Sequence, residues 1–430
     1  MTTPVLWSIA GTDSGGGAGL AADQRAADAF GVHLCPVVAA VTAQNSCAVT
    51  RIEPLPVDWL EAQLQALAGD LPPTAVKTGL LGGVAQVQCV ARWIDRLRCE
   101  GPVALVVDPV FAASTGAAFA DGAIVRAYRE LLLPRASVVT PNRREALQLA
   151  GPGPEAEGAG TDAVPALARR LQGAGVAAVC ITGGDSIDMA QREDLLDWLA
   201  SEHAQGGLAS PRIATPHNHG TGCTFATGVA AGLALGYVAA DAVILAKMAT
   251  THALRFGRAT GSGAGAVIAQ PGFHAEPTLL PRMSWGEAPR FAPLRNRADD
   301  RPLDLYAIVD SAQRVLQVLD AGVRTVQLRM KTPRAPDAQW PGRLRDAVAC
   351  SVLACRDAGA ELFVNDHWML ARELGAGGVH LGQEDLLALG EAGRDALQRS
   401  GLALGISSHS LWELCRARVL SPRYVACGPV

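Results

Sequence analysis

A glycine-rich helix start is the feature of this sequence with the clearest chemical potential. The segment HGTGCTF, residues 219–225, precedes a long charge-free stretch. Gly220 and Gly222 would leave the amides of Thr221, Gly222 and Cys223 open at a helix N-terminus, where they can hold the charge that develops on a transferring phosphoryl group. The same field would lower the pKa of Cys223, which could then act as base toward a substrate hydroxyl. For a cysteine alone, a buried structural role is the more common case.

Two polar segments near the N-terminus could bind the rest of a substrate. GTDSGGGAG, residues 11–19, follows an apolar run, and such a loop lets backbone amides approach an anionic ligand closely. It lacks the Gly-Lys-Ser/Thr ending of a P-loop, so a tight strand-to-helix turn is the alternative. In VTAQNS, residues 41–46, the Gln44 carboxamide can donate and accept along one edge, as an aminopyrimidine ring requires. The alternative for Gln44 is a cap on the backbone of a loop.

A third segment, TPNRREA, carries Asn142 and Glu145 three residues apart. Side chains at this spacing can orient water around a magnesium ion that bridges phosphates. The alternative is a helix N-cap followed by a surface glutamate. Both interpretations stay open at the level of the sequence.

The last part of the chain places polar clusters after four successive apolar runs. The clusters are Gln327, Arg329 and Lys331; Asn365, Asp366 and His367; His380, Gln383, Glu384 and Asp385; and Ser407, Ser408 and His409. In a βα barrel, chemistry gathers at such strand ends. Carboxylates on neighbouring strand ends suit Mg²⁺, whereas Arg and Lys suit a pyrophosphate. We find no Ser-His-Asp set or paired-glutamate arrangement in the sequence that would favour hydrolysis.

The elements that must position these groups alternate between short apolar runs and amphipathic segments, which is the pattern of a parallel sheet covered by helices. The apolar runs are nearly continuous, which predicts strands buried on both faces. We expect strands at 5–10, 37–42, 75–78, 104–108, 138–140 and 178–182, and in a second series at 305–309, 325–329, 362–365, 379–381, 403–406 and 424–428.

The chain has 430 residues, which is too long for one ordinary core, so we expect two domains. Residues 271–302 hold six prolines and no sustained periodicity, which predicts a linker between a domain at 1–270 and a domain at 303–430. The charge-free stretch 225–240 has a glycine every fourth residue, as some membrane helices do. It is shorter than the roughly 20 residues of a membrane span, so we expect a buried helix packed on a sheet.

Composition excludes several classes of function. Charged residues make up 18% and hydrophobic residues 49% of the chain, as in a compact soluble protein. The net charge is −4 without a basic tract, so we expect no nucleic-acid partner. The ten cysteines form no C-x-x-C pair, which indicates reduced thiols. Residues 1–4 do not open a signal peptide, and we expect a cytoplasmic homo-oligomer with no membrane partner.

Taken together, the motifs of the first domain resemble a known enzyme family. GTDSGGGAG, VTAQN, AVKTG, VVDPV, TPNRREA and HGTGCTF occur in the order and spacing of the hydroxymethylpyrimidine and phosphomethylpyrimidine kinases of the ribokinase-like superfamily, over about residues 4–270. The resemblance implies an α/β fold with three layers and a parallel sheet. It also implies two ATP-dependent phosphorylations in thiamine biosynthesis, first of the hydroxymethyl group of the pyrimidine and then of the resulting monophosphate.

The same resemblance implies roles for single residues. Gly11 and Gln44 contact the pyrimidine, Asp23 lies near the substrate pocket, Asn142 and Glu145 fall in the magnesium and phosphate region, and Cys223 is the expected base in an anion hole with Gly220, Thr221 and Gly222. One departure is ITGGD, residues 181–185. Many relatives carry a lysine before the glycine pair, where this chain has Thr182, so the triphosphate contact of that lysine is left open.

The second domain resembles thiamine phosphate synthase, a TIM-type (β/α) barrel, through LYAIVD, QLRMK, NDHWMLA, GVHLGQED, GISSH and YVACGPV over residues 305–430. That family joins the pyrimidine diphosphate to a thiazole phosphate while magnesium-held pyrophosphate leaves. The resemblance assigns Gln327 to the pyrimidine, Arg329, Lys331 and Asn365 to the diphosphate, Asp366 and Asp385 to Mg²⁺, and Ser407 to the pyrophosphate site.

The sequence stops in the sixth expected strand of this series, whereas a closed barrel has eight. We therefore expect an incomplete barrel, either because the chain is part of a longer bifunctional enzyme or because the second activity is lost. The alternatives are a kinase with a non-catalytic C-terminal module and a kinase that acts on a pyridoxal-like ring. A pure binding protein fits least well, because the three phosphate-handling motifs occur together.

Overall fold

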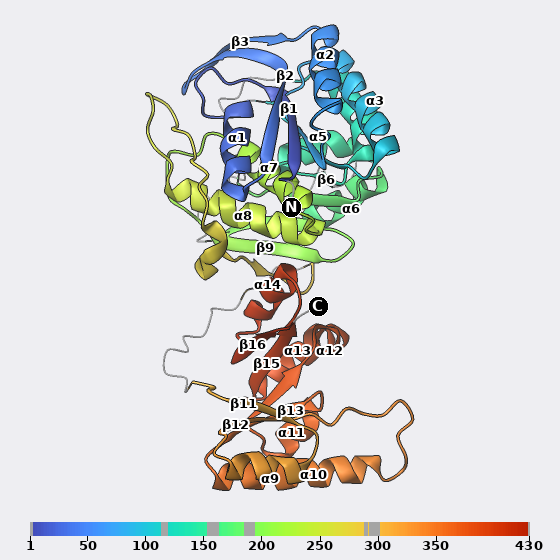
Figure 1. Ribbon diagram of the computed structural model, residues 1–430, viewed down its shortest axis with the longest axis vertical. Helices are drawn as coiled ribbons and strands as arrows, with labels where there is room; N and C mark the ends of the chain where they lie inside the picture. The colour runs from blue at the N-terminus through green and yellow to red at the C-terminus, as the bar shows by residue number, and fades with distance from the viewer. Residues whose placement is uncertain are drawn as a thin grey trace. The chain divides into compact units, whose positions relative to one another are not determined.

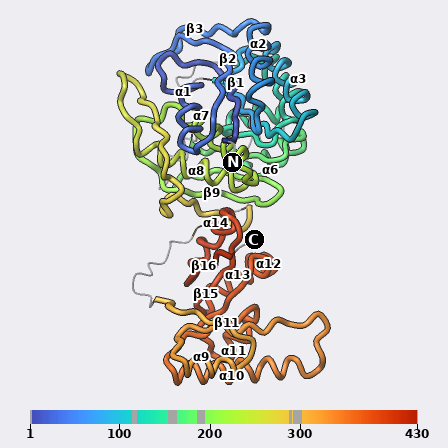
Figure 2. Tube along the Cα trace, viewed as in Figure 1, coloured from blue at the N-terminus to red at the C-terminus, as the bar shows by residue number. Residues whose placement is uncertain are grey.

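The computed structural model describes residues 3–112, 119–152, 163–184, 194–287, 291 and 302–428. The chain divides into two compact units, Met1–Pro289 and Arg290–Val430, each with a sheet of its own. Figure 1 shows the elements of each unit, and Figure 2 shows the path of the chain through them.

The first unit is built on a ten-stranded sheet with the order β10-β9-β8-β7-β6-β5-β4-β1-β2-β3. From β2 through β1, β4, β5 and β6 to β7, neighbouring strands are parallel. This part contains all six strands predicted for the first domain. The ten strands are β1 (Val5–Gly11), β2 (His33–Gln44), β3 (Val49–Pro54), β4 (Ala75–Thr78), β5 (Ala104–Val107), β6 (Val138–Val139), β7 (Ala178–Ile181), β8 (Asp194–Ala200), β9 (Gln205–Pro211) and β10 (Arg282–Met283).

The four strands that the sequence did not predict extend the sheet by antiparallel pairing, at β2–β3 on one side and at β7–β8, β8–β9 and β9–β10 on the other. Their residues explain why. β9 reads QGGLASP and β3 reads VTRIEP, and neither has a long apolar run or a clean alternation of polar and apolar residues. The predicted parallel sheet is therefore confirmed for the centre, while the whole sheet is mixed.

Helices cover both faces of this sheet, which gives the three layers expected (Figure 1). Trp7 and Ile9 of β1 join a core to which the helices α2, α3 and α6 contribute. Ser8 lies between them and faces the other way, because successive side chains of a strand alternate, and it donates a hydrogen bond to Asp23 of α1. The helices are α1 (Gly19–Phe30), α2 (Val57–Ala68), α3 (Val84–Glu100), α4 (Gly122–Ala127), α5 (Arg143–Ala150), α6 (Ala163–Gly173), α7 (Thr221–Ala234) and α8 (Ala239–Arg255).

The charge-free stretch forms most of α7, which packs against α1, α8 and the strands β1, β4 and β5. Glycines permit the close approach to α8: a Cβ added at Gly232 would lie 2.9 Å from the Cα of Ala242, and one at Gly228 would lie 3.1 Å from the Cα of Ala246. The prediction of a buried helix packed on the sheet is therefore confirmed. Among the residues that the structure describes, no helix combines the length and apolarity needed to cross a membrane.

The first part of the predicted linker at 271–302 is structured. Two short 3₁₀ turns, Phe273–Ala275 and Pro277–Leu279, lead to β10, which pairs with β9. Phe273, Leu279 and Met283 are buried. Residues 271–284 thus pack on the first unit, and elements of two or three residues are too short to leave a periodic pattern. Residues 288–290 and 292–301 lie outside the described part of the chain.

The second unit contains a six-stranded sheet whose strands follow the chain order from β11 to β16, and every neighbouring pair is parallel. This is the strand order of the first six βα units of a TIM-type barrel, so the expected incomplete barrel matches the described residues. The strands are β11 (Tyr306–Val309), β12 (Thr325–Leu328), β13 (Glu361–Asn365), β14 (Gly378–Leu381), β15 (Ala403–Ser408) and β16 (Tyr424–Cys427). The helices are α9 (Ala312–Asp320), α10 (Trp340–Asp357), α11 (Trp368–Leu374), α12 (Gln383–Ala388), α13 (Gly390–Arg399) and α14 (Leu411–Val419).

The contact between α7 and α8 yields a prediction. Gly232→Ala should lower the free energy of unfolding of the first unit by about 1–3 kcal/mol, because the new methyl group meets the backbone of Ala242 and the helices must separate. Gly69→Ala is the matched control, since a Cβ there meets nothing within 4 Å, and it should be neutral or slightly stabilising. Equal denaturant midpoints for the two variants would contradict the tight packing.

Candidate active site

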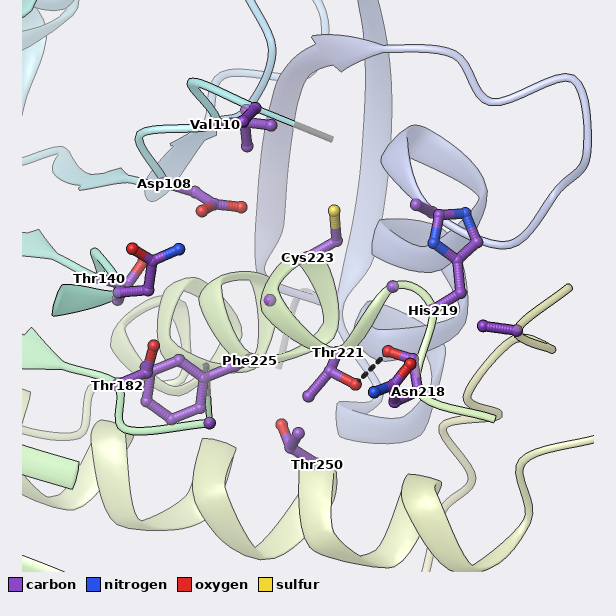
Figure 3. Close-up of a pocket in the computed structure, with 18 of the residues that line it drawn as sticks. Asp108, Val110, Thr140, Thr182, Asn218, His219, Thr221, Cys223, Phe225 and Thr250 are labelled. Carbon is purple, nitrogen blue, oxygen red and sulfur yellow. Dashed lines mark hydrogen bonds between the residues drawn. The ribbon is translucent and has the colours of Figure 1, made fainter. Parts of the chain in front are cut away.

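One cavity of about 1840 Å³ opens at the carboxyl ends of the parallel strands of the first unit. Gln44, at the end of β2, and Cys223, in the first turn of α7, both line it. Gly11 at the end of β1 and the α7 start, Gly220, Thr221 and Gly222, line it as well. Figure 3 shows Cys223, Thr221 and His219 facing the same space as Asp108 and Thr140 from the sheet. The edge of a parallel sheet therefore brings together residues that lie far apart in the sequence.

The two glycine-rich segments interlock at this edge. Gly220 has a φ of 83°, and a Cβ on it would lie 2.2 Å from the carbonyl oxygen of Gly17. Gly19 has a φ of 56°, and its Cβ would lie 2.3 Å from the oxygen of Gly11. Only glycine satisfies both requirements, a left-handed backbone and room for a neighbouring carbonyl. The two loops thus fix each other in place.

The amides of the first loop bind a side chain of the loop itself. Asp13 accepts hydrogen bonds from the amides of Gly15, Gly17 and Ala18 over 2.8–3.0 Å. The sequence suggested that these amides would approach a ligand, and the structure instead supports the alternative of a tight strand-to-helix turn. The role of this loop is therefore to shape the cavity wall.

Asp13 also joins the two segments. His219 Nε2 lies 3.0 Å from Asp13 Oδ2 and 3.2 Å from Gln44 Nε2. Burial alone would raise the pKa of Asp13, but the hydrogen bonds from His219, Ala18 and Gly15 hold it below its ordinary value. Sequence reasoning missed the roles of Asp13 and His219. Asp13 lies within GTDSGGGAG and His219 within HGTGCTF, and these positions could have pointed to a role in the site.

The sequence suggested that the amides of Thr221, Gly222 and Cys223 would all be open to a phosphoryl group. The structure supports this for only some of them. The amide of Thr221 donates to Asn218 O over 3.3 Å, and the Thr221 hydroxyl donates to the same oxygen over 2.6 Å (Figure 3). The amide of Thr224 donates to Gly220 O. The amides of Gly222 and Cys223 belong to the first turn, where a helix provides no acceptor of its own. These two amides are the ones that can meet an anion.

The predicted pKa shift of Cys223 was wrong in direction. Burial raises the pKa of Cys223 to about 12; Lys77 and a hydrogen bond from the Gly19 amide act against this, and the carboxylates of Asp23 and Asp108 add to it. The field of a helix start is thus outweighed by the loss of water and by two neighbouring negative charges. In the ligand-free protein, Cys223 is held as a thiol.

Asp23 does not line the cavity but lies beneath it, fully buried. Both of its carboxylate oxygens lie 3.0 Å from Lys77 Nζ, and Ser8 and Thr227 donate to it over 2.6 and 2.8 Å. Burial would lower the pKa of Lys77, but Asp23 and the other negative groups nearby raise it, so Lys77 stays charged at the cavity wall. Asp23 is thus close to the cavity, as expected, but it contacts Lys77 rather than the open space, which supports a positioning role.

Asp108, at the end of β5, is a second residue that sequence reasoning left without a role. It lines the cavity, and its Oδ2 is buried without a hydrogen-bond partner in the described residues. Lys77 Nζ lies 3.6 Å from this oxygen. Burial raises the pKa of Asp108 to about 6, partly opposed by Lys77. The carboxylate is therefore mostly ionised at neutral pH and lacks a full partner, as a ligand for a cation would be.

Asn142 and Glu145 line the cavity and form a capping box at the start of α5. The Glu145 amide donates to Asn142 Oδ1 and the Asn142 amide donates to Glu145 Oε2, both over 2.9 Å. The structure thus shows a helix cap that includes the glutamate, and the same two residues border the cavity. Thr182 forms an isolated parallel bridge with Asn142 and also lines the cavity.

The mouth of the cavity is bordered by two loops. Ser46 and Cys47, in the turn between β2 and β3, line it, as do Gly263 and Ala264. The amide of Gly263 donates to the Ser46 hydroxyl over 3.1 Å, and a Cβ on Gly263 would lie 2.0 Å from Ser46 O.

In the second unit, the predicted magnesium and diphosphate residues lie within electrostatic reach of one another. Burial raises the pKa of Asp366, the charge of Asp385 adds to this, and His367, Lys331 and Arg329 oppose it. Asp366 has a φ of 65°, a left-handed conformation that aspartate tolerates better than most residues. Asp385 accepts from the Gly382 amide at the start of α12. Among the described residues, no three His, Cys, Asp or Glu side chains are grouped to hold a metal by themselves.

Two residues predicted to contact the substrates, Gln327 and Ser407, lie near the carboxyl ends of β12 and β15. Gln327 donates to the Tyr306 hydroxyl over 3.0 Å, and the Ser407 hydroxyl lies 2.9 Å from His380 Nε2. Tyr424 connects the two, since its hydroxyl bonds Tyr306 and lies 2.8 Å from His380 Nδ1. Burial lowers the pKa of His380 to about 4, and Arg329 adds to the effect.

Asn365, the remaining predicted diphosphate residue, is buried at the end of β13. Its Nδ2 has no hydrogen-bond partner in the described part of the chain. A buried amide donor of this kind costs free energy unless a ligand accepts from it.

Comparisons with known proteins fit this geometry. The family model described as phosphomethylpyrimidine kinase matches residues 13–268, and the model described as thiamine monophosphate synthase matches residues 305–430. A probable chloroplastic thiamine biosynthetic bifunctional enzyme from Oryza sativa subsp. japonica is 31% identical over 443 residues, which cover 100% of this chain and 75% of the relative. A hydroxymethylpyrimidine/phosphomethylpyrimidine kinase from Synechococcus elongatus is 40% identical over 265 residues, which cover 62% of this chain and 97% of the relative.

A solved structure is similar as well. The ADP complex of Bacillus subtilis pyridoxal kinase superposes with a TM-score of 0.56 at 30% identity, covering 62% of this chain and 98% of that structure.

The environment of Cys223 yields a prediction about pH. Because burial and two carboxylates raise its pKa to about 12, the ligand-free protein should carry no thiolate at position 223 between about pH 6 and pH 9. The thiolate absorbance of the parent minus that of Cys223→Ser should stay flat across this range, which subtracts the exposed cysteines. A difference that titrates with a midpoint near neutrality would contradict the assignment.

Proposed function

Because the chain belongs to the phosphomethylpyrimidine kinase family and carries a domain of the thiamine monophosphate synthase family, we propose that its first unit phosphorylates 4-amino-5-hydroxymethyl-2-methylpyrimidine. ATP is the phosphate donor. The same site then phosphorylates the monophosphate to the diphosphate, and the second unit uses this product in thiamine biosynthesis.

The observation that carries the proposal is that Gln44 and Cys223 line a single cavity. A carboxamide that can read an aminopyrimidine edge and a helix start that can hold a phosphoryl group are thus within reach of one small substrate. Gly11 lines the same cavity and is assigned to the ring. With the ring held by Gln44, the hydroxymethyl group would face the first turn of α7.

In the transfer, the bond from the γ-phosphorus to the β–γ bridging oxygen breaks, and a bond to the hydroxymethyl oxygen forms. The amides of Gly222 and Cys223, with Gly220 and Thr221 shaping the turn, stabilise the charge on the moving phosphoryl group. The proton of the hydroxyl passes to Cys223. Because the free protein holds Cys223 as a thiol, its own proton must first pass to solvent or to the Asp108 carboxylate, and the positive charge of Lys77 favours this loss. Asp108, ionised at neutral pH, is the second group that can accept the proton.

The residues present fit a magnesium ion bound together with ATP. Mg²⁺ at kinase sites is held through one or two carboxylates plus the phosphates, so a complete set of protein ligands is not required. Asp108 offers a buried carboxylate oxygen without a hydrogen-bond partner in the described residues. Asn142 and Glu145 border the same cavity and would orient water in the magnesium and phosphate region. The ion would neutralise charge on the phosphates, while Lys77 and the α7 amides act on the transferring group.

For the second unit, we propose that Asp366 and Asp385 hold Mg²⁺, that Arg329, Lys331 and Asn365 bind the diphosphate, and that Gln327 and Ser407 contact the pyrimidine and the pyrophosphate. The electrostatic coupling of Asp366 to Asp385, Lys331 and Arg329 supports this grouping. The ion would favour departure of pyrophosphate, and the thiazole nitrogen would then bond to the methylene carbon of the pyrimidine. Thiazole phosphate is the expected partner substrate.

A second candidate for the first unit is a pyridoxal-type kinase. The likeness to the Bacillus subtilis pyridoxal kinase structure favours it. A pyridine ring also offers a polar edge, so Gln44 alone does not separate the two substrates. For the whole chain, the homo-oligomeric state and the cytoplasmic location stay predictions, and the relative from Oryza sativa is named as chloroplastic.

The kinase proposal predicts distinct losses in two variants. Cys223→Ala should lower kcat for the pyrimidine by about 10²- to 10⁴-fold with little change in its KM, because a proton acceptor is lost. Gln44→Ala should chiefly raise the KM for the pyrimidine. Asp108→Asn is measured alongside over a range of Mg²⁺ concentrations, and a larger kcat loss there than in Cys223→Ala that excess Mg²⁺ does not reduce would move the base to Asp108. Turnover of pyridoxal but not of the pyrimidine by the parent would replace this function with the second candidate.

The synthase proposal predicts coupled product. With ATP, Mg²⁺, hydroxymethylpyrimidine and thiazole phosphate, the chain should form thiamine phosphate, and Asp366→Asn should stop this while diphosphate still accumulates. Asparagine also tolerates the left-handed backbone at this position, so the substitution removes mainly the charge. The products are separated by chromatography. Diphosphate without coupled product from the parent would leave only the kinase activity for this chain.

A further inference from the structure

The cavity wall formed by β8 and α8 contains a buried ion pair. Lys247 and Asp197 are 3% and 4% exposed, and both line the cavity. Lys247 Nζ lies 2.5 Å from Asp197 Oδ2. A buried ion pair contributes little net stability, because removing two charges from water costs about as much as their attraction returns. A pair kept at a cavity wall is better explained by what the cavity binds.

Asp197 links Lys247 to the turn where the expected lysine is missing. The amide of Gly183 donates to Asp197 Oδ1 over 2.9 Å, while Lys247 holds the other oxygen of the same carboxylate. Only this carboxylate separates the Lys247 ammonium from the backbone of the residue after Thr182. Thr182 lines the cavity as well. A positive charge is therefore present close to position 182, although it comes from another element.

Polar groups without partners surround this part of the cavity. Thr140 Oγ1, Ser210 Oγ and Thr250 Oγ1 are buried, line the cavity and lack a hydrogen-bond partner in the described residues. Figure 3 shows Thr140, Thr182 and Thr250 around the side of the cavity where Phe225 projects. Buried hydroxyls left unpaired cost free energy, and a ligand rich in hydrogen-bond acceptors would remove that cost.

Lysine is rare in this chain, and Lys247 is one of the few that occur. Of 37 Lys and Arg residues only three are lysines: Lys77, Lys247 and Lys331. Lys77 and Lys247 line this cavity, and Lys331 follows the strand assigned to the diphosphate. Lysine is a compact charge with three rotatable donors, whereas arginine is a planar fork, so the two do not replace each other at a fitted site. Nearly all basic residues of the chain are thus arginines, whereas lysine occurs beside the two candidate phosphate sites.

We propose that Lys247 binds the phosphate chain of ATP and takes the place of the lysine expected at position 182. The inference rests on the proposed kinase function. Asp197 occupies one of the three N–H donors of Lys247 and orients the group, and the others remain for phosphate oxygens. Arg143, Arg144 and Arg212 also line the cavity, but they are not buried, so water screens their charges more than that of Lys247. Lys77 is buried as well, but both oxygens of Asp23 hold it on the side of the cavity next to Cys223 and Asp108.

The test uses the full chain and the double variant Asp197→Asn/Lys247→Met. This variant removes both charges and keeps an oxygen that can accept from the Gly183 amide, so no unpaired charge is left buried. The KM for ATP should rise about 10- to 100-fold with the KM for the pyrimidine unchanged, as expected for one lost hydrogen bond between charged groups. Adding Thr182→Lys should recover at least part of this loss. Arg255→Met, a basic residue of the same helix that does not line the cavity, is the matched control.

Binding of the non-hydrolysable analogue AMP-PCP, measured by calorimetry, separates this inference from the kinase proposal. A parent that binds AMP-PCP but does not phosphorylate the pyrimidine would reject the kinase proposal alone. An unchanged affinity for AMP-PCP in the double variant would overturn the role of Lys247 and leave the charge to the arginines. A loss that affects both substrates equally and that Thr182→Lys does not reverse would also overturn it, because the pair would then be structural.

Discussion

The close contact between two glycine-rich segments is the constraint on which the first unit depends. The loop after β1 and the start of α7 touch through backbone atoms, at Gly17 against Gly220, and any side chain at Gly220 would meet a carbonyl oxygen at 2.2 Å. The hydrogen bond between Asp13 and His219 closes the same joint. Since α7 packs on α8 through further glycines, its whole length is held close to the sheet. The amides at its start are therefore fixed before a ligand arrives, which is what preorganised charge stabilisation requires.

Two buried carboxylates, Asp23 and Asp197, form ion pairs with the buried lysines of the cavity wall. Asp23 lies beneath the cavity and keeps Lys77 charged at the wall, while Asp197 forms a buried ion pair with Lys247. Each cation is thus held by a carboxylate behind it. Burial, together with the carboxylates of Asp23 and Asp108, raises the pKa of Cys223, so the ligand-free protein has a neutral thiol rather than a reactive thiolate at this position. These ion pairs hold the two lysine side chains at the cavity, which suits a site that binds a highly charged nucleotide.

The sequence predicted the parallel centre of the first sheet, all six strands of the second unit and the cavity shared by Gln44 and Cys223. These depend on long apolar runs and on strand ends, which leave clear patterns. The edge strands, such as β9 with its paired glycines, were missed because pairing with a neighbour rather than composition makes them strands. The pKa of Cys223 was predicted in the wrong direction because burial by distant segments is invisible in a local motif. Lys247 lies in an apolar helix, and only the fold brings it to Asp197.

The contact between Ser46 and Gly263 at the cavity mouth has a consequence for exchange of ligands with solvent. The two loops meet through a hydroxyl and a backbone amide and not through the apolar core. They can therefore part while the sheet and α7 stay intact, since such openings involve little buried apolar surface. Opening of these two loops is accordingly separate from unfolding of the core. At 263 itself glycine is required for the contact, since a Cβ there would lie 2.0 Å from the carbonyl oxygen of Ser46.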